Sequence, residues 1–180
     1  MGTQGWLAGA RRLRSPNHDR RPKGTAIDLI VVHGISLPPG RFGGRWIADL
    51  FMNRLDSNAH PYFASIATLR VSTHLLLRRD GTVLQFVSLD ARAWHAGVSR
   101  FRGRERCNDY SIGIELEGAD DIPYTQRQYA RLATLARLIM RRHPQVTPSR
   151  IVGHSQVAPG RKTDPGLAFD WRAFRARLAR

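Results

Sequence analysis

The stretch Ser111-Ile112-Gly113-Ile114-Glu115-Leu116-Glu117-Gly118 alternates apolar side chains with small or acidic ones. Successive side chains of a β-strand point to opposite faces, so such alternation predicts a strand with one apolar face. The apolar face would hold Ile112, Ile114 and Leu116, and the opposite face would hold Gly113, Glu115 and Glu117.

Short apolar runs on either side of this stretch predict the rest of a sheet. Residues 71–77 and 82–87 are strand-like and are joined by Arg79-Asp80-Gly81. Asp-Gly between two such runs is a strong signal for a hairpin. Residues 27–33 and 151–154 are further apolar runs, and each of them ends in a histidine, His33 or His154.

Helices are predicted around these strands. Thr125 followed three residues later by Gln128 is typical of a capping box, and an apolar stripe then continues to Pro144. Residues 46–55 and 170–180 predict two shorter helices, while residues 1–25, 56–69 and 90–109 have the composition of loops. The mixed order of strands and helices predicts an α/β or α+β fold, with one sheet covered by helices.

The composition restricts the class of protein. A chain of 180 residues is most simply one domain, residues 1–180, and its net charge of +15 would attract anions such as nucleic acid, an acidic membrane face or a polycarboxylate ligand. The single cysteine, Cys107, permits no internal disulfide. No run approaches the roughly 18 apolar residues of a membrane span, and the first residues lack a signal-peptide pattern. We therefore expect a cytoplasmic protein.

The segment from His154 to Asp164 has the composition of a metal site. It holds two potential zinc ligands and Lys162, one of only two lysines in the chain, in a loop broken by Pro159-Gly160. A catalytic zinc needs three protein ligands and one open position, so a third ligand must come from elsewhere. Of the seven histidines, His33 stands out with His154 because each follows an apolar strand, where sites are commonly built.

Two of the three glutamates, Glu115 and Glu117, share one face of the predicted strand. A carboxylate beside a zinc-bound water can act as a general base. The alternative is a solvated strand face with two charges of no function, and the alternation alone does not separate the two glutamates. The sequence contains no nucleophile elbow, phosphate-binding loop, dinucleotide fingerprint or His-Glu-x-x-His motif. The residues together favour a zinc hydrolase.

Several longer motifs carry a family resemblance. They include Val31-Val32-His33, Ile35-Ser36-Leu37-Pro38-Pro39-Gly40, His60-Pro61-Tyr62-Phe63, Leu69-Arg70-Val71-Ser72, Arg92-Ala93-Trp94-His95-Ala96-Gly97, Gly103-Arg104-Glu105-Arg106-Cys107-Asn108-Asp109 and Phe169-Asp170-Trp171. With the strand at 111–118 and the segment 153–166, they cover nearly the whole chain. The chain resembles the cytosolic zinc amidases of bacterial cell-wall recycling, which share the fold of peptidoglycan recognition proteins.

The resemblance implies a central mixed sheet flanked by helices and one catalytic domain. It implies one Zn²⁺ per chain held by His33, His154 and Asp164, with Glu115 as general base and Lys162 stabilising the oxyanion. The implied reaction is hydrolysis of the amide between the lactyl group of 1,6-anhydro-N-acetylmuramic acid and L-alanine of the stem peptide. The resemblance also makes Arg70, Trp94 and Arg106 candidates for substrate binding.

Three other functions remain in view. A peptidoglycan-binding module without catalysis typically loses a zinc ligand, whereas His33, His154 and Asp164 are all present. A broad amidase acting on intact cell wall would need an export signal. A nucleic-acid-binding protein is motivated only by the net charge of +15. We expect a monomer whose partner is a soluble anhydromuropeptide, with no nucleic acid and no membrane.

Overall fold

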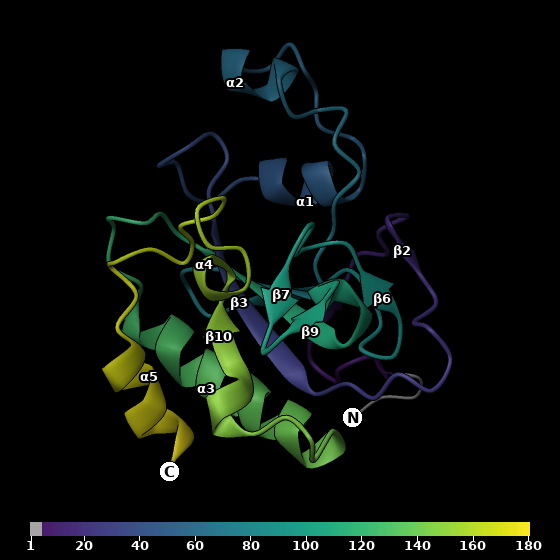
Figure 1. The fold of residues 1–180 in the computed structure, drawn as a ribbon. Helices are drawn as coiled ribbons and strands as arrows, with labels where there is room; N and C mark the ends of the chain where they lie inside the picture. The colour runs from purple at the N-terminus through teal and green to yellow at the C-terminus, as the bar shows by residue number, and fades with distance from the viewer. Residues whose placement is uncertain (1–4) are drawn as a thin grey trace.

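A six-stranded mixed sheet, in the order β1-β5-β4-β9-β3-β10, forms the centre of the computed structural model, which describes residues 5–180 (Figure 1). Its strands are β1 (Arg11–Arg12), β3 (Leu29–Ile35), β4 (Leu75–Leu77), β5 (Val83–Gln85), β9 (Ser111–Glu117) and β10 (Ile151–Gly153). β4, β9, β3 and β10 are parallel, and β4 and β5 form an antiparallel hairpin. The prediction of a single central mixed sheet flanked by helices is confirmed.

One face of the sheet is covered by helices α3 (Gln126–Arg142) and α5 (Trp171–Leu178), which lie together in Figure 1. The predicted capping box begins α3: the Thr125 hydroxyl accepts from the Gln128 backbone N–H at 3.2 Å, and the side-chain oxygen Oε1 of Gln128 accepts from the Thr125 backbone N–H at 3.0 Å. The apolar face of β9 packs against the apolar stripe of α3, and together they form the main hydrophobic core. Members of this core include Ile112, Ile114, Leu116, Leu132, Ala136 and Ile139.

The opposite face is covered by shorter elements. These are α1 (Trp46–Phe51), α2 (Pro61–Ala64), α4 (His154–Val157) and the 3-10 helix η2 (Cys107–Asp109), with two small sheets that pair β2 (His18–Asp19) with β6 (Arg92–Ala93) and β7 (Arg100–Phe101) with β8 (Arg104–Glu105). A second 3-10 helix, η3 (Pro148–Arg150), leads into β10, and Arg175 of α5 donates to its Pro148 carbonyl. Two smaller apolar clusters fill the space under them. Because this cover consists of loops and single turns, it leaves room for a site.

Some predicted boundaries were wrong. Residues 71–73 do not join β4, because the Ser72 N–H bonds the Trp94 carbonyl at 3.1 Å and the Thr73 hydroxyl bonds the Gly113 carbonyl at 2.9 Å instead of extending the hairpin. The three segments expected to be loops contain β1, β2, β6, β7, β8, α2 and η2. Residues 1–4, part of the first such segment, lie outside the described residues.

The carboxyl ends of β3, β9 and β10 meet at one edge of the sheet because the three strands are parallel. Ligands of open α/β sheets commonly bind outside these ends. Within residues 5–180, the helices are all too short or too polar to cross a membrane.

Candidate metal and catalytic site

Three side chains gather at this edge of the sheet. His33 lies on β3, directly opposite Glu115 in the ladder of β3 and β9, and His154 begins α4 immediately after β10. Asp164 arrives from the loop that follows α4, where its carbonyl accepts from the Ser155 N–H at 3.0 Å. Segments far apart in sequence therefore meet where strand ends hold them rigidly.

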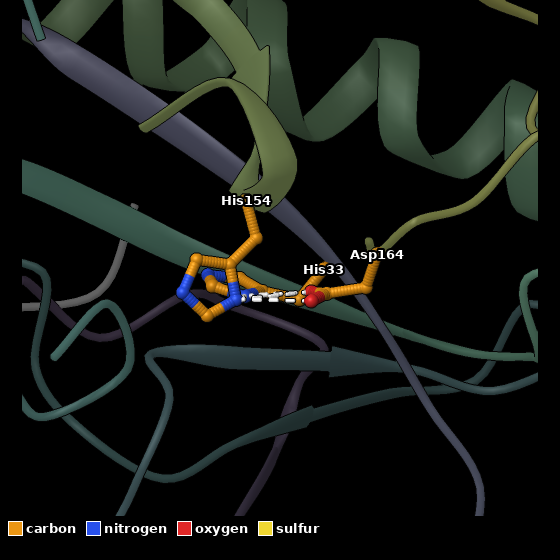
Figure 2. A group of neighbouring side chains, drawn as sticks. All are labelled: His33, His154 and Asp164. Atoms are coloured by element: carbon orange, nitrogen blue, oxygen red, sulfur yellow. Dashed lines mark hydrogen bonds and ion pairs between the residues drawn. The ribbon is translucent and has the colours of Figure 1, made fainter. Parts of the chain in front are cut away.

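The ligand atoms of His33, His154 and Asp164 form a nearly equilateral triangle (Figure 2). The two histidine Nδ1 atoms are 3.0 Å apart, and they lie 3.2 Å and 3.1 Å from Oδ2 of Asp164. In a tetrahedral zinc site with bonds of about 2.0–2.1 Å, ligand atoms are about 3.3 Å apart. The three atoms thus have the spacing of one face of such a tetrahedron, and its fourth corner is left for water or substrate.

The protonation states suit a cation at this point. Nε2 of His154 lies 3.2 Å from the Ala96 carbonyl, which can only accept, so Nε2 donates and Nδ1 is the ring atom that faces the triangle. Burial lowers the pKa of His33 to about 4, so its ring is neutral near pH 7. Burial opposes the ionisation of Asp164, but the two histidines beside it outweigh this effect and lower the pKa of that carboxyl.

The peptide after Asp164 is anchored by Tyr124. The Tyr124 hydroxyl donates to the Pro165 carbonyl at 2.9 Å, and the tyrosine is buried. Its ring and hydroxyl fill space beside Gly34 and Gly118, where an added Cβ would overlap Tyr124. The two glycines at the ends of β3 and β9 therefore let Tyr124 hold the loop that carries Asp164.

Glu115 lies beside the triangle, with Oε1 at 3.9 Å from Nδ1 of His33. The side chain is buried, and Oε2 has no hydrogen-bond partner among residues 5–180. Burial, together with the nearby charge of Asp164, raises the pKa of Glu115 well above its usual value, and Lys162 opposes this shift. A carboxylate with a raised pKa and a free oxygen is suited to take up a proton.

Glu117 is in a different environment although it is on the same face of β9. Its Oε1 accepts from the Gly43 N–H at 2.7 Å, and its Oε2 accepts from the Arg79 N–H at 3.3 Å. Glu117 thus holds the loop before α1 and the hairpin turn against the sheet. The alternative of a solvated strand face is wrong for both glutamates, since Glu115 is 8% exposed and Glu117 3%.

Lys162 is exposed, in the loop between His154 and Asp164. Its backbone N–H donates to the Ala158 carbonyl at 3.0 Å, which tightens the turn at the end of α4. The residue lines the same cavity as His33 and Glu115. Its ammonium charge is close enough to act on the ionisation of both groups.

The cavity over the triangle has a volume of about 580 Å³. Trp94 lines it, and the backbone N–H of Trp94 donates to the Ser72 hydroxyl at 3.0 Å. Arg70 is exposed next to the lining residues Leu69 and Val71, and its guanidinium donates to the Thr68 carbonyl. Arg106 lies in a neighbouring hollow, where it pairs with Asp109 at 3.3 Å. Of the three candidates for substrate binding, Trp94 alone lines the main cavity.

His95 is a site residue that the sequence reasoning left undecided. It lines the cavity, and its Nδ1 lies 3.0 Å from Nε2 of His33. The segment 90–109 has no periodicity that predicts where its side chains point. The only available signal was the position of His95 beside Trp94 in a motif of the resemblance.

Relatives of the chain are known. The family model described as N-acetylmuramoyl-L-alanine amidase matches residues 23–167. The 1,6-anhydro-N-acetylmuramyl-L-alanine amidase AmpD of Citrobacter freundii is 58% identical over 173 residues, which cover 96% of this chain and 92% of that protein. The same enzyme of Escherichia coli strain K12 is 56% identical over 177 residues, which cover 98% of this chain and 96% of that protein.

A solved structure of a selenomethionine derivative of AmpD matches with a TM-score of 0.96 and 56% identity over 99% of both chains. The family model matches most of this chain, and named amidases are more than half identical to it. Both findings agree with the triangle of ligand atoms at the sheet edge. This chain belongs to the N-acetylmuramoyl-L-alanine amidase family of hydrolases.

Proposed function

We propose that this protein is a zinc-dependent amidase that hydrolyses the amide between the lactyl group of 1,6-anhydro-N-acetylmuramic acid and L-alanine of the stem peptide, in peptidoglycan recycling. The observation that carries the proposal is the triangle of His33, His154 and Asp164 with Glu115 beside it. The names of the AmpD relatives support this bond as the one cleaved.

The donor set fits zinc. Two neutral imidazole nitrogens and one carboxylate oxygen are common ligands of a catalytic zinc, and their separations of 3.0–3.2 Å suit a tetrahedral ion. When bound, Zn²⁺ supplies a Lewis acid for the amide carbonyl and lowers the pKa of a water ligand to about 7.

Glu115 is the general base of the proposed reaction. Its free carboxylate oxygen takes the proton of the attacking water, and the same carboxyl then passes that proton to the nitrogen of the leaving L-alanine. The transfer is aided by burial, which raises the pKa of the carboxyl and so increases its affinity for a proton. Glu115 thus serves as base in the first step and as acid in the second.

Lys162 stabilises the oxyanion that forms at the carbonyl of the lactyl group. Lys162 is exposed at the wall of the cavity, and its ammonium carries a positive charge. A cation placed where negative charge develops favours the transition state over the ground state. We expect Lys162 to act mainly on kcat.

The substrate carries several carboxylates, so a basic groove suits it. Trp94 offers an apolar surface to the sugar ring, while Arg70 and Arg106 offer guanidinium groups to the carboxylates of the peptide. AmiD of E. coli, solved in complex with anhydro-N-acetylmuramic acid-L-Ala-D-gamma-Glu-L-Lys, matches this fold with a TM-score of 0.63 and 28% identity, over 88% of this chain and 60% of that one. This supports a ligand of the same class.

The remaining parts of the proposal concern the whole protein. Residues 1–180 form one catalytic domain that works as a monomer in the cytoplasm, with a soluble anhydromuropeptide as its partner. Neither nucleic acid nor membrane takes part. Gel filtration tests the monomer, and fractionation of cells tests the location.

The central experiment incubates the purified protein with anhydromuramyl tripeptide, with and without a chelator, and detects free tripeptide by mass. We expect release that the chelator abolishes and Zn²⁺ restores. Binding without release would indicate a module without catalysis. Equal cleavage of insoluble cell-wall sacculi at the same enzyme concentration would indicate a broad cell-wall amidase.

A further inference from the structure

His95 makes a hydrogen-bonded connection between the ligand triangle and β9. Its Nδ1 lies 3.0 Å from Nε2 of His33, and its Nε2 lies 3.2 Å from the Ser111 hydroxyl. The rings of His33 and His95 meet edge to face, at 84° and 5.1 Å between centroids. The nitrogen of His33 that faces away from the triangle therefore has a defined partner.

The donor and the acceptor in each of these two hydrogen bonds follow from counting the protons on the rings. A neutral imidazole has one proton, and a ring that offers Nδ1 to a metal must carry it on Nε2. Nε2–H of His33 then donates to Nδ1 of His95, so the proton of a neutral His95 is on Nε2, which donates to Ser111. A metal-ligating histidine commonly donates its other N–H in this way, and the partner fixes both tautomer and ring orientation.

The backbone of β9 is shaped to receive the His95 ring. A Cβ added at Gly113 would lie 2.5 Å from Cγ of His95, so a side chain at this position would displace the ring. On the other side, the His95 and Ala96 N–H groups both donate to the Asn108 side chain, at 3.1 Å and 2.8 Å. The ring is thus fixed by contacts that are independent of His33.

The two histidine ligands differ in what holds them. His154 donates to the carbonyl of Ala96, which no substitution removes, whereas His33 depends on the side chain of His95. His95 and Ala96, which are adjacent in the sequence, therefore contact Nε2 of His33 and Nε2 of His154, respectively. Loss of the side chain would affect one ligand and leave the other in place.

We infer that His95 is a positioning residue, which holds His33 in the tautomer and orientation that direct Nδ1 to the metal. The inference rests on the proposed zinc site. It adds a function for a histidine that is not one of the three proposed ligands. It also gives Gly113 a role, as the residue that leaves space for the ring.

The test compares His95→Ala, His95→Asn and the control His18→Ala, which removes an exposed histidine that is not among the residues lining the cavity. The protein is stripped of metal and titrated with Zn²⁺ against a competing chelator. His95→Ala should weaken zinc binding by about ten- to a hundredfold. His95→Asn should recover part of the affinity, because its amide oxygen can accept where Nδ1 does, and His18→Ala should match the parent.

Gly113→Ala provides a second route to the same effect. It should weaken zinc binding in the parent protein but have little further effect when His95 is already alanine, because the displaced ring is then absent. Equal losses in both backgrounds would show that Gly113 acts on the strand itself, and that part of the inference would fail.

Nitrogen NMR of the zinc-loaded parent gives a readout that needs no variant. The proton of His33 should be on Nε2, and a proton on Nδ1 would overturn the inference even if His95→Ala failed to fold. Unchanged zinc affinity in a folded His95→Ala protein would also overturn it while leaving the zinc site standing. Failure of the parent protein to bind Zn²⁺ would instead refute the proposed function.

Discussion

Glu115 and Glu117 lie two residues apart on the same buried face of β9, yet their surroundings are opposite. Both oxygens of Glu117 accept from backbone N–H groups, whereas one oxygen of Glu115 has no partner among the described residues. Two backbone donors fix the position of a buried carboxylate, whereas an oxygen without a donor is free to accept a proton. The comparison teaches that neighbouring loops, rather than residue type or strand face, separate the structural glutamate from the one proposed as general base.

The largest effect is expected when one of the proposed metal ligands next to Glu115 is removed. His154→Ala should lose zinc and reduce amide hydrolysis below detection, because two ligands bind the ion far more weakly than three. Zinc content measured by atomic absorption and release of tripeptide measured by mass check this. Full turnover with stoichiometric zinc in this variant would mean that the triangle is not the metal site.

Exchange of each glutamate for glutamine tests the comparison directly. Glu115→Gln keeps the size of the side chain and removes the base, so kcat should fall by about a hundredfold or more while zinc content is preserved. Glu117→Gln should reduce kcat much less. If Glu117→Gln is the inactive variant and Glu115→Gln turns over normally, the two roles have been assigned the wrong way round.

The pH dependence of the free energy of unfolding should also distinguish Glu115 from Glu117. The pKa of Glu115 is raised by burial, so in metal-free protein the folded state holds this proton more tightly than the unfolded state. The stability of the parent should therefore fall, relative to Glu115→Gln, as pH rises from about 4.3, the ordinary glutamate pKa, through the raised value. Urea titrations of both metal-free proteins across this range measure the difference, which bound Zn²⁺ should reduce. A constant difference would show that Glu115 does not titrate as inferred.

The smallest effect is expected for Glu117→Gln on folding. An amide has one accepting oxygen, so its NH₂ group would face one of the two N–H donors, from Gly43 or Arg79. The free energy of unfolding should fall by about 1–3 kcal/mol, the usual cost of an unsatisfied buried polar group. Chemical denaturation checks this. Thr134→Ala, at an exposed position of α3, is a control that should lose little.

The sequence carried enough information for the main elements of the sheet and for its longest helix. Alternation placed Ile112, Ile114 and Leu116 on the helix-covered face, and Asp80-Gly81 marked the hairpin between β4 and β5. These features are local, because the period of the side chains and the chemistry of the turn are set within a few residues. β1 was missed because Arg11 and Arg12 are exposed at the sheet edge and have no apolar pattern.

The site was only partly predictable. His33 and His154 could be found because each follows an apolar strand, and Asp164 because it is near His154 in sequence. Glu115 and Glu117 could not be told apart by alternation, since the difference comes from the backbone of Gly43 and Arg79, distant in sequence. The contact of His95 with His33 likewise depends on how an aperiodic segment folds over the sheet.

The direct pairing of His33 with Glu115 across β3 and β9 has a consequence for how this gene can change. Deletion of a single codon within β9 would shift the strand by one residue, and every side chain beyond it would change faces. An isoleucine or leucine would then stand beside the histidine, and a carboxylate would face the apolar side of α3. Length variation in this lineage should therefore be confined to the connecting loops.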